Sequence, residues 1–122
     1  MTKERILFIL RDDEFLKDVI VSLDRTKYNI EVETSSVRGL ENIVSDQPFI
    51  LFLDIAMRDI VSHQVCRYLR YIHKTKHLPI VLLVDDKTPK QNLFWAMELG
   101  ASDYLTEPIE ELVINEKIKK FA

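Results

Sequence analysis

The chain has 122 residues, is 47% hydrophobic and 30% charged, and carries a formal net charge of -3 at pH 7. This length suffices for one domain with a buried core, and no apolar run approaches the roughly 20 residues that a membrane span needs. The single cysteine, Cys66, excludes an internal disulfide and a multi-cysteine zinc site, and the two glycines exclude a glycine-rich phosphate loop.

Strands and helices are expected to alternate from the start of the chain. The apolar run over 6–10 is too short for a helix and predicts a buried strand, and apolar residues then recur at helical spacing over 15–23. Ile30 and Val32 alternate with glutamates, which is typical of an edge strand. Ser35 or Ser36 can cap the next helix. That helix is expected to bury one face: Val37, Leu40, Ile43 and Val44.

The same alternation continues to the end of the chain. Apolar runs predict strands over 49–53 and 80–84, separated by a helix over 61–72. Thr88 and Pro89 suit the start of a helix that ends at Gly100, and a short strand over 102–106 leads to a last helix over 109–121. Five strands alternating with five helices predict an α/β fold: a doubly wound (βα)5 domain with a five-stranded parallel sheet, single over 1–122.

Function in such a sheet is expected at the carboxyl ends of the strands. The residues that follow the strands are polar: Arg11, Asp12 and Asp13 after the first, Asp54 after the third, Asp85 and Asp86 after the fourth, and Glu107 and Pro108 after the fifth. Asp54 closes an apolar run abruptly. Packing does not explain a carboxylate there, although a solvated strand end would.

Three segments, in this order and spacing, resemble the receiver domain of bacterial response regulators, in the CheY-like, flavodoxin-like superfamily. They are Pro48 followed by Phe49–Asp54, then Leu78–Val81, then Leu99–Thr106 before a proline. The resemblance covers the whole chain. It implies that an aspartate ending the third strand accepts a phosphoryl group from a sensor histidine kinase. It further implies a magnesium ion held by acids after the first strand, and a Ser or Thr and a Lys that contact the phosphate.

Carried over residue by residue, the resemblance places Asp54 at the phosphoacceptor position. Tyr104 falls on the aromatic position that changes rotamer on activation, and Pro108 follows a peptide bond that is commonly cis in the family. Val84 stands where the family has a phosphate-binding hydroxyl, and Glu107 stands where it has the lysine. The last two substitutions remove the groups that would detect the phosphate.

The acidic pair of the family has two possible positions in this chain. Running the first strand straight through places Leu10 and Arg11 at the paired-acid positions, and this register is favoured by the helical phase that follows. Arg11 would then occupy the space of the ion and form a forked pair with Asp54. A slip of one or two residues would instead bring Asp12 or Asp13 to Asp54, as magnesium ligands.

These substitutions predict a degenerate receiver, or pseudo-receiver. It would be a non-enzymatic module of a two-component or phosphorelay system that acts by protein–protein contact, with impaired phospho-switching and no cofactor. The alternative is a functional, Mg-dependent receiver phosphorylated at Asp54, with Asp12 and Asp13 as further metal ligands. A third class, a flavodoxin-like enzyme or ligand binder, is disfavoured because no nucleophile converges on the crevice.

The predicted partner surface lies on the fourth helix. Five consecutive apolar residues, Leu93–Met97, exceed the stripe that one buried face needs, so some of Phe94, Trp95 and Met97 should face outward. In the family this helix, the fifth strand and the fifth helix form the usual dimer or partner face. The expected partners are proteins, such as a histidine kinase, an output domain or a second copy. Neither nucleic acid nor membrane is expected, and the location is expected to be cytoplasmic.

Overall fold

The computed structural model describes residues 3–122. One sheet contains β1 (Glu4–Ile9), β2 (Tyr28–Glu33), β3 (Ile50–Asp54), β4 (Ile80–Val84) and β5 (Asp103–Thr106). The helices are α1 (Lys17–Ser22), α2 (Ser36–Ser45), α3 (Ser62–Tyr71), α4 (Lys90–Glu98) and α5 (Glu111–Phe121), with a 3-10 turn η1 (His73–Thr75) after α3. Every strand pair is parallel and the order is β2-β1-β3-β4-β5, which confirms the doubly wound α/β fold.

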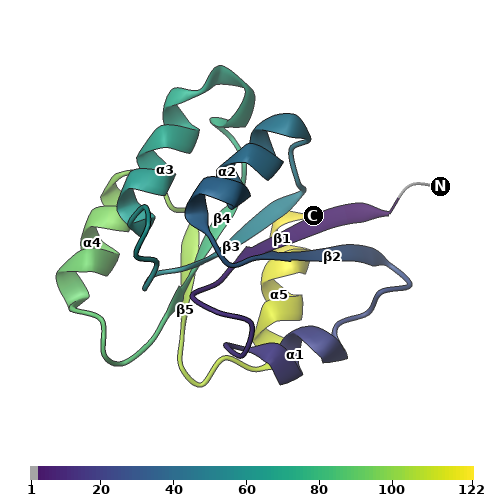
Figure 1. The fold of residues 1–122 in the computed structure, drawn as a ribbon. Coiled ribbons are helices and arrows are strands. Elements are labelled where there is room, and N and C mark those ends of the chain that lie inside the picture. Colours follow the sequence, from purple (N-terminus) through teal and green to yellow (C-terminus); the bar gives the residue numbers. More distant parts are fainter. Residues whose placement is uncertain (1–2) are drawn as a thin grey trace.

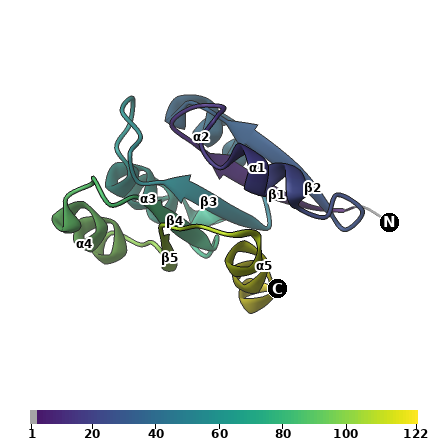
Figure 2. The same cartoon turned by 90° about the horizontal axis from the view of Figure 1, so that it is seen from below.

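The helices form two layers on opposite faces of the sheet (Figures 1 and 2). α2, α3 and α4 cover one face, where Ile43, Leu69 and Ala96 pack on the sheet. α1 and α5 cover the other, where Ile20 and Ile114 pack. The central strands β3 and β4 are buried throughout, which explains their continuous apolar sequence.

The switch in strand order places the ends of β1 and β3 side by side. β1 pairs with β2 on one side and with β3 on the other, and Ile9 lies opposite Leu53. β4 follows β3 in the sheet, with Leu83 opposite Asp54. The segments that leave β1, β3 and β4 therefore meet at one edge of the sheet, as expected for the functional crevice of this fold.

The first helix begins later than its sequence pattern predicts. Phe15 and Leu16 precede α1, and Leu16 adopts a left-handed conformation with φ 60°. The carboxylate of Asp12 accepts hydrogen bonds from the backbone N–H groups of Glu14 and Phe15, at 2.9 and 2.8 Å. This turn holds residues that would otherwise form the first turn of the helix.

The buried face of α2 also differs from the prediction. Ser35 caps the helix, as one of the two serines was expected to do, by accepting a hydrogen bond from the N–H of Arg38. Ile43 is buried, but Val37 and Val44 are exposed. Gly39 faces the sheet instead, and a Cβ there would collide with the side chain of Ile9. Close contact through this glycine sets the rotation of the helix and turns the two valines outward.

The fourth helix begins one residue later than expected. Thr88 does not cap it, because its hydroxyl and its N–H both donate to Asp85, at 2.6 and 2.8 Å. The helix starts after Pro89 and ends before Gly100, whose φ of 128° is the terminating conformation that the glycine predicted. Within residues 3–122, no helix is both long and apolar enough to cross a bilayer.

Candidate functional site

A cleft of about 900 Å³ opens at the carboxyl ends of the strands. Its lining includes Arg11 and Asp12 after β1, Ala56 after β3, and Asp85 and Thr88 after β4. These residues come from three loops that the sheet brings together. The cleft is thus where the strand order predicted it.

Asp54 ends β3 and its side chain is completely buried. Its Oδ1 accepts hydrogen bonds from Nη2 of Arg11 and from the N–H of Ala56, both at 2.9 Å. Its Oδ2 accepts from the N–H of Arg11 at 2.8 Å and from Nε of Arg11 at 2.7 Å. Both oxygens of the carboxylate are therefore occupied by donors from the protein itself.

Arg11 supplies the cation of this site. Its guanidinium forms the expected fork on Asp54, and its Nη1 lies 2.8 Å from Oδ2 of Asp85. The guanidinium also stacks on Phe15, 3.8 Å from the ring centroid. The hydrogen bond to Asp54 raises the pKa of Arg11 against the opposing effect of burial. One side chain thus bridges two carboxylates and is fixed from a third direction by an aromatic ring.

Asp85 is the second carboxylate of the bridge. While Oδ2 contacts Arg11, its Oδ1 accepts hydrogen bonds from the backbone and hydroxyl of Thr88 and from the N–H of Lys87. Burial favours the protonated form, but the hydrogen bonds from Thr88 and the charge of Arg11 hold the pKa of Asp85 below its ordinary value. The carboxylate is therefore ionised at neutral pH, when it balances Arg11.

The residues before and after Arg11 lie elsewhere. Leu10 is not a pocket residue, because its side chain belongs to the core beneath α1 and α5. Asp12 reaches the cleft, but its Oδ1 is engaged by the backbone of the following turn. Asp13 is exposed. Within residues 3–122, no three His, Cys, Asp or Glu side chains gather as metal ligands would.

The positions that would contact a phosphate contain no hydrogen-bond donor of the expected kind. Val84 is buried at the end of β4, and Glu107 is exposed after β5. Both line a hollow next to Asp85, together with Tyr104, which is half exposed. The Glu107–Pro108 peptide bond is cis, as predicted.

The predicted partner surface on α4 is partly exposed. Phe94 is 61% exposed and Trp95 is 42% exposed, so two of the three predicted residues face outward. Met97 does not, because it packs against the core that α3 and α4 share. Trp95 also contacts His63 of α3 edge to face, with ring centroids 5.5 Å apart.

The contacts of two carboxylates, Asp85 and Asp59, could not be predicted from the sequence. Asp85 was placed after the fourth strand, but its contact with Arg11 depends on the register of β3 against β4. Asp59, in the loop after β3, accepts hydrogen bonds from the hydroxyl of Ser35 and the N–H of Val37. It joins that loop to the start of α2. No sequence signal linked these groups, because Ser35 and Val37 lie 24 and 22 residues from Asp59 along the chain.

The fold and the site define a class: single-sheet α/β modules with a buried aspartate at the carboxyl end of β3. The response regulator receiver domain family matches residues 7–119, and the chain belongs to this family. Response regulator MprA of Mycobacterium ulcerans is 33% identical over 111 residues, covering 89% of this chain and 47% of its own length. Transcriptional regulatory protein AfsQ1 of Streptomyces coelicolor is 27% identical, covering 93% of this chain and 49% of its own.

Solved structures show the same fold. Chemotaxis response regulator CheY4 of Vibrio cholerae matches with a TM-score of 0.84 and 16% identity, over 99% of this chain and 100% of that one. The receiver domain of sensor histidine kinase PA1611 from Pseudomonas aeruginosa, solved with magnesium in its active-site cleft, matches with a TM-score of 0.83 and 15% identity, over 98% of each chain. The present chain spans about half the length of the first-ranked curated relatives that it matches.

Proposed function

We propose that this receiver domain is a degenerate one, in which phospho-switching is impaired and signalling depends on protein contacts. The observation that carries the proposal is the bridge from Arg11 to Asp54 and Asp85. A guanidinium lies on the acceptor carboxylate, with both acceptor oxygens already bonded. Arg11 therefore takes over the charge balance that a divalent cation provides in a phosphorylated receiver.

Phosphoryl transfer to Asp54 would need a free carboxylate oxygen and an arrangement that neutralises the transferred charge. Here a reacting oxygen must first give up bonds to Arg11. The phosphoryl group would then add about -1.5 to -2 charges to a cleft that already contains Asp85 and has Glu107 at the lysine position. Val84 cannot bond a phosphate oxygen, so the phosphorylated state gains no contact there by which to shift a conformational equilibrium.

The donor set is also poor for magnesium. Mg²⁺ prefers near-octahedral oxygen ligands, usually from carboxylates and phosphate. Arg11, which contacts Asp54, is a cation, and Asp12, which lines the cleft, accepts hydrogen bonds from a backbone turn. We therefore propose that the domain has no resident metal and assign no step to one.

The module is proposed to be a single, non-enzymatic domain that acts in the cytoplasm. Cys66, the one thiol, is buried in the core, where burial raises its pKa to about 12 and removes it as a nucleophile. Histidine kinases and output domains are the partner classes of the family. Phe94 and Trp95 offer one contact surface, through which two copies could also pair across α4, β5 and α5.

A second candidate is a working phosphoacceptor, favoured by the position of Asp54 at the end of β3. It requires Arg11 to leave both carboxylates and Asp12 or Asp13 to turn toward the vacated space. The outcome would be a Mg-dependent receiver phosphorylated by a histidine kinase. It differs from the first proposal in one measurable respect, which is the affinity of the cleft for magnesium together with a phosphoryl mimic.

Beryllofluoride mimics an aspartyl phosphate and needs no kinase. We expect that magnesium with beryllofluoride changes neither the Trp95 fluorescence nor the amide NMR shifts of the wild-type protein. A triple variant, Arg11→Asp, Val84→Thr and Glu107→Lys, rebuilds the missing groups and should bind the mimic, which validates the assay. Saturable binding by the wild type that disappears in Asp54→Asn contradicts the degenerate reading and establishes the second candidate.

A further inference from the structure

Two grooves run along α3, one on each side. The groove toward α2, of about 740 Å³, is lined by Val37, Leu40, Val44 and Ile60 among others. The groove toward α4, of about 550 Å³, includes Arg67, Arg70, Tyr71 and Leu99. Gln64 and Tyr68 line both grooves, so the outer ridge of α3 divides one continuous surface. We name this surface the α3 face, defined by Val37, Val44, Arg67, Tyr68, Arg70 and Tyr71.

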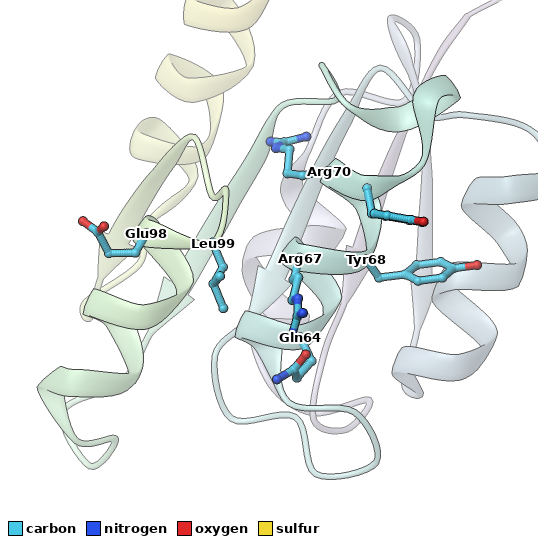
Figure 3. A pocket seen from close by; sticks show the side chains of 7 residues that line it. Gln64, Arg67, Tyr68, Arg70, Glu98 and Leu99 are labelled. Atoms are coloured by element: carbon cyan, nitrogen blue, oxygen red, sulfur yellow. The ribbon is translucent and has the colours of Figure 1, made fainter.

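The α3 face exposes large apolar and aromatic groups. Tyr71 is 87% exposed and Tyr68 is 47% exposed, and the two valines of α2 are also exposed. Figure 3 shows Tyr68 extending from α3 toward α2, while Leu99 and Glu98 come from α4 on the opposite side. Tyrosines beside an apolar groove are typical of the buried centre of protein interfaces. A protein partner would remove this surface from water.

The segment that contains α3 carries positive charge in a protein that is negative as a whole. Residues 60–84 contain no Asp or Glu, but include four cationic side chains: Arg67, Arg70, Lys74 and Lys76. All three histidines of the chain lie in the same segment: His63, His73 and His77. Glu41 lines the groove toward α2 and Glu98 lines the groove toward α4. Among residues 3–122, neither glutamate forms an ion pair with Arg67, nor does any other carboxylate.

Arg70 lacks an anionic partner although it is half buried. Its guanidinium donates to the carbonyl oxygens of Gly100 and Thr75, at 2.8 and 3.2 Å, and to the hydroxyl of Ser102 at 3.3 Å. All three acceptors are neutral. Burial lowers the pKa of Arg70, because no carboxylate compensates for the lost hydration. A carboxylate beside this half-buried guanidinium would interact in surroundings less polar than bulk water, where the attraction between opposite charges is stronger.

We propose that the α3 face is a docking site for a protein segment that carries apolar side chains beside carboxylates. The apolar side chains fill the groove between α2 and α3, and the carboxylates bind Arg67 and Arg70 across the ridge of Tyr68 and Tyr71. This inference rests on the proposal that the domain acts through protein contacts. It adds a surface separate from Phe94 and Trp95 and assigns the chemistry of the partner.

The face suits such a segment better than the other possible occupants. A second copy of the chain docked on the same face would bring Arg67 and Arg70 against their own equivalents, which is unfavourable for a two-fold contact. A nucleic acid would bring many phosphates to a protein of net charge -3 and would leave the valine-lined groove unfilled. An acidic, apolar segment matches both the charge and the groove.

The proposal can be tested by selection from a display library of random peptides on the immobilised wild-type protein. Each selection is repeated on two disrupted variants, Arg67→Glu and Tyr71→Ser. It is also repeated on two matched controls away from the face, Lys27→Glu and Leu112→Ser. Amide NMR shifts of the labelled protein then locate the bound peptide. The same NMR titration with an oligothymidylate tests whether a nucleic acid binds the face. Light scattering of the protein alone tests whether two copies pair.

We expect selected peptides to be enriched in Asp or Glu next to Leu, Ile, Val or aromatic residues. The amide shifts that the peptides cause in the protein should map to α2, α3 and the end of α4. Arg67→Glu should weaken peptide binding at least about tenfold, while Lys27→Glu should not. No enrichment, or shifts confined to α4, β5 and α5, overturns the proposal while leaving the degenerate receiver intact. Preferred binding of the oligothymidylate would show that the occupant is a nucleic acid. Dimerisation that is lost in Tyr71→Ser would show that it is a second copy, and either result overturns the proposal. Conversely, beryllofluoride binding refutes the degenerate receiver but not this site.

Discussion

The arginines in the cleft at the end of the sheet and on the α3 face differ in the charge of their bonding partners. In the cleft, Arg11 is bonded to two carboxylates and stacked on Phe15, so its charge is balanced within the domain. On the α3 face, Arg70 has only neutral acceptors and Arg67 forms no ion pair within residues 3–122. The arginine charge is balanced inside the domain in the first region and is not balanced there in the second.

This difference bears on where the domain can respond to something outside itself. A site whose donors and acceptors already pair must break internal bonds before it binds a ligand, and each broken bond lowers the affinity. On the α3 face this cost is smaller, because Arg67 forms no ion pair within residues 3–122 and Arg70 bonds only neutral acceptors. Under our two proposals, the phosphoacceptor position therefore serves as a structural element, while the α3 face binds a partner.

Among the substitutions that test this comparison, Arg11→Ala is expected to have the largest effect on stability. Removing the guanidinium leaves two buried carboxylates without a counter-ion, and the free energy of unfolding should fall by about 3 kcal/mol. Urea unfolding measures the change. Millimolar magnesium should recover part of the loss in the variant and leave the wild type unchanged. The exposed Arg58, in the same cleft, is the control, since Arg58→Ala should change stability by less than about 0.5 kcal/mol.

A smaller loss, about 2 kcal/mol, is expected for Asp54→Asn, because the fork from Arg11 then meets a neutral amide. The sign of the change is the informative part. In a cleft of unpaired carboxylates the same substitution relieves repulsion and stabilises the fold. A stability gain in thermal unfolding would therefore show that Arg11 is not bonded to Asp54 in solution.

Acid should destabilise the domain through carboxylates outside the cleft. Burial raises the pKa of Asp103, but hydrogen bonds from Lys117 and Lys120 outweigh it and hold the pKa at about 2. Because this value lies below the ordinary one, the stabilisation is present above about pH 4 and is lost as the pH falls toward 2. Asp103→Asn should cost about 1 kcal/mol at pH 7 and nothing near pH 2. Unfolding at several pH values tests this, and a constant difference between the variant and the wild type would contradict it.

The smallest effects on stability are expected on the α3 face itself. Arg67→Glu and Tyr71→Ser should each change the free energy of unfolding by less than about 0.5 kcal/mol, because neither side chain is buried or ion-paired. Chemical unfolding next to the binding assay separates the two roles. A loss of several kcal/mol in either variant would mean that the face supports the fold, and the contrast with the cleft would then disappear.

The strands could be predicted from the sequence to within two residues at either end, because buried parallel strands are continuous apolar runs. Helix starts were less predictable. Thr88 is a residue type that often caps helices, but its hydroxyl is bonded to Asp85. Leu16 adopts a left-handed conformation that nothing in its residue type requires. Likewise, the rotation of α2 depends on Gly39 meeting Ile9, a contact between segments 30 residues apart. Such tertiary contacts override local pattern.

For the site, register along one strand was enough to place Arg11 on Asp54, since both follow strands that are neighbours in the sheet. The contact between Asp85 and Arg11 could not be predicted in this way. It depends on how the loop after β4 folds around the hydroxyl of Thr88, which a linear reading does not determine. The α3 face was missed for a related reason, because the exposure of Val37 and Val44 follows from the rotation of α2.

The bridge made by Arg11 also bears on the order in which substitutions could build the family's phosphate-binding groups into this cleft. Introducing a lysine at Glu107 first would add a second cation to a cleft where one guanidinium faces two carboxylates, and this exposed position should tolerate it. Replacing Arg11 by an acid first would instead bring a third carboxylate to the other two, so that folding would depend on the magnesium concentration. Of the two intermediates, we expect only the second to lose stability. The lysine would therefore have to precede the acid, and the bridge itself would be the last part of the cleft to change.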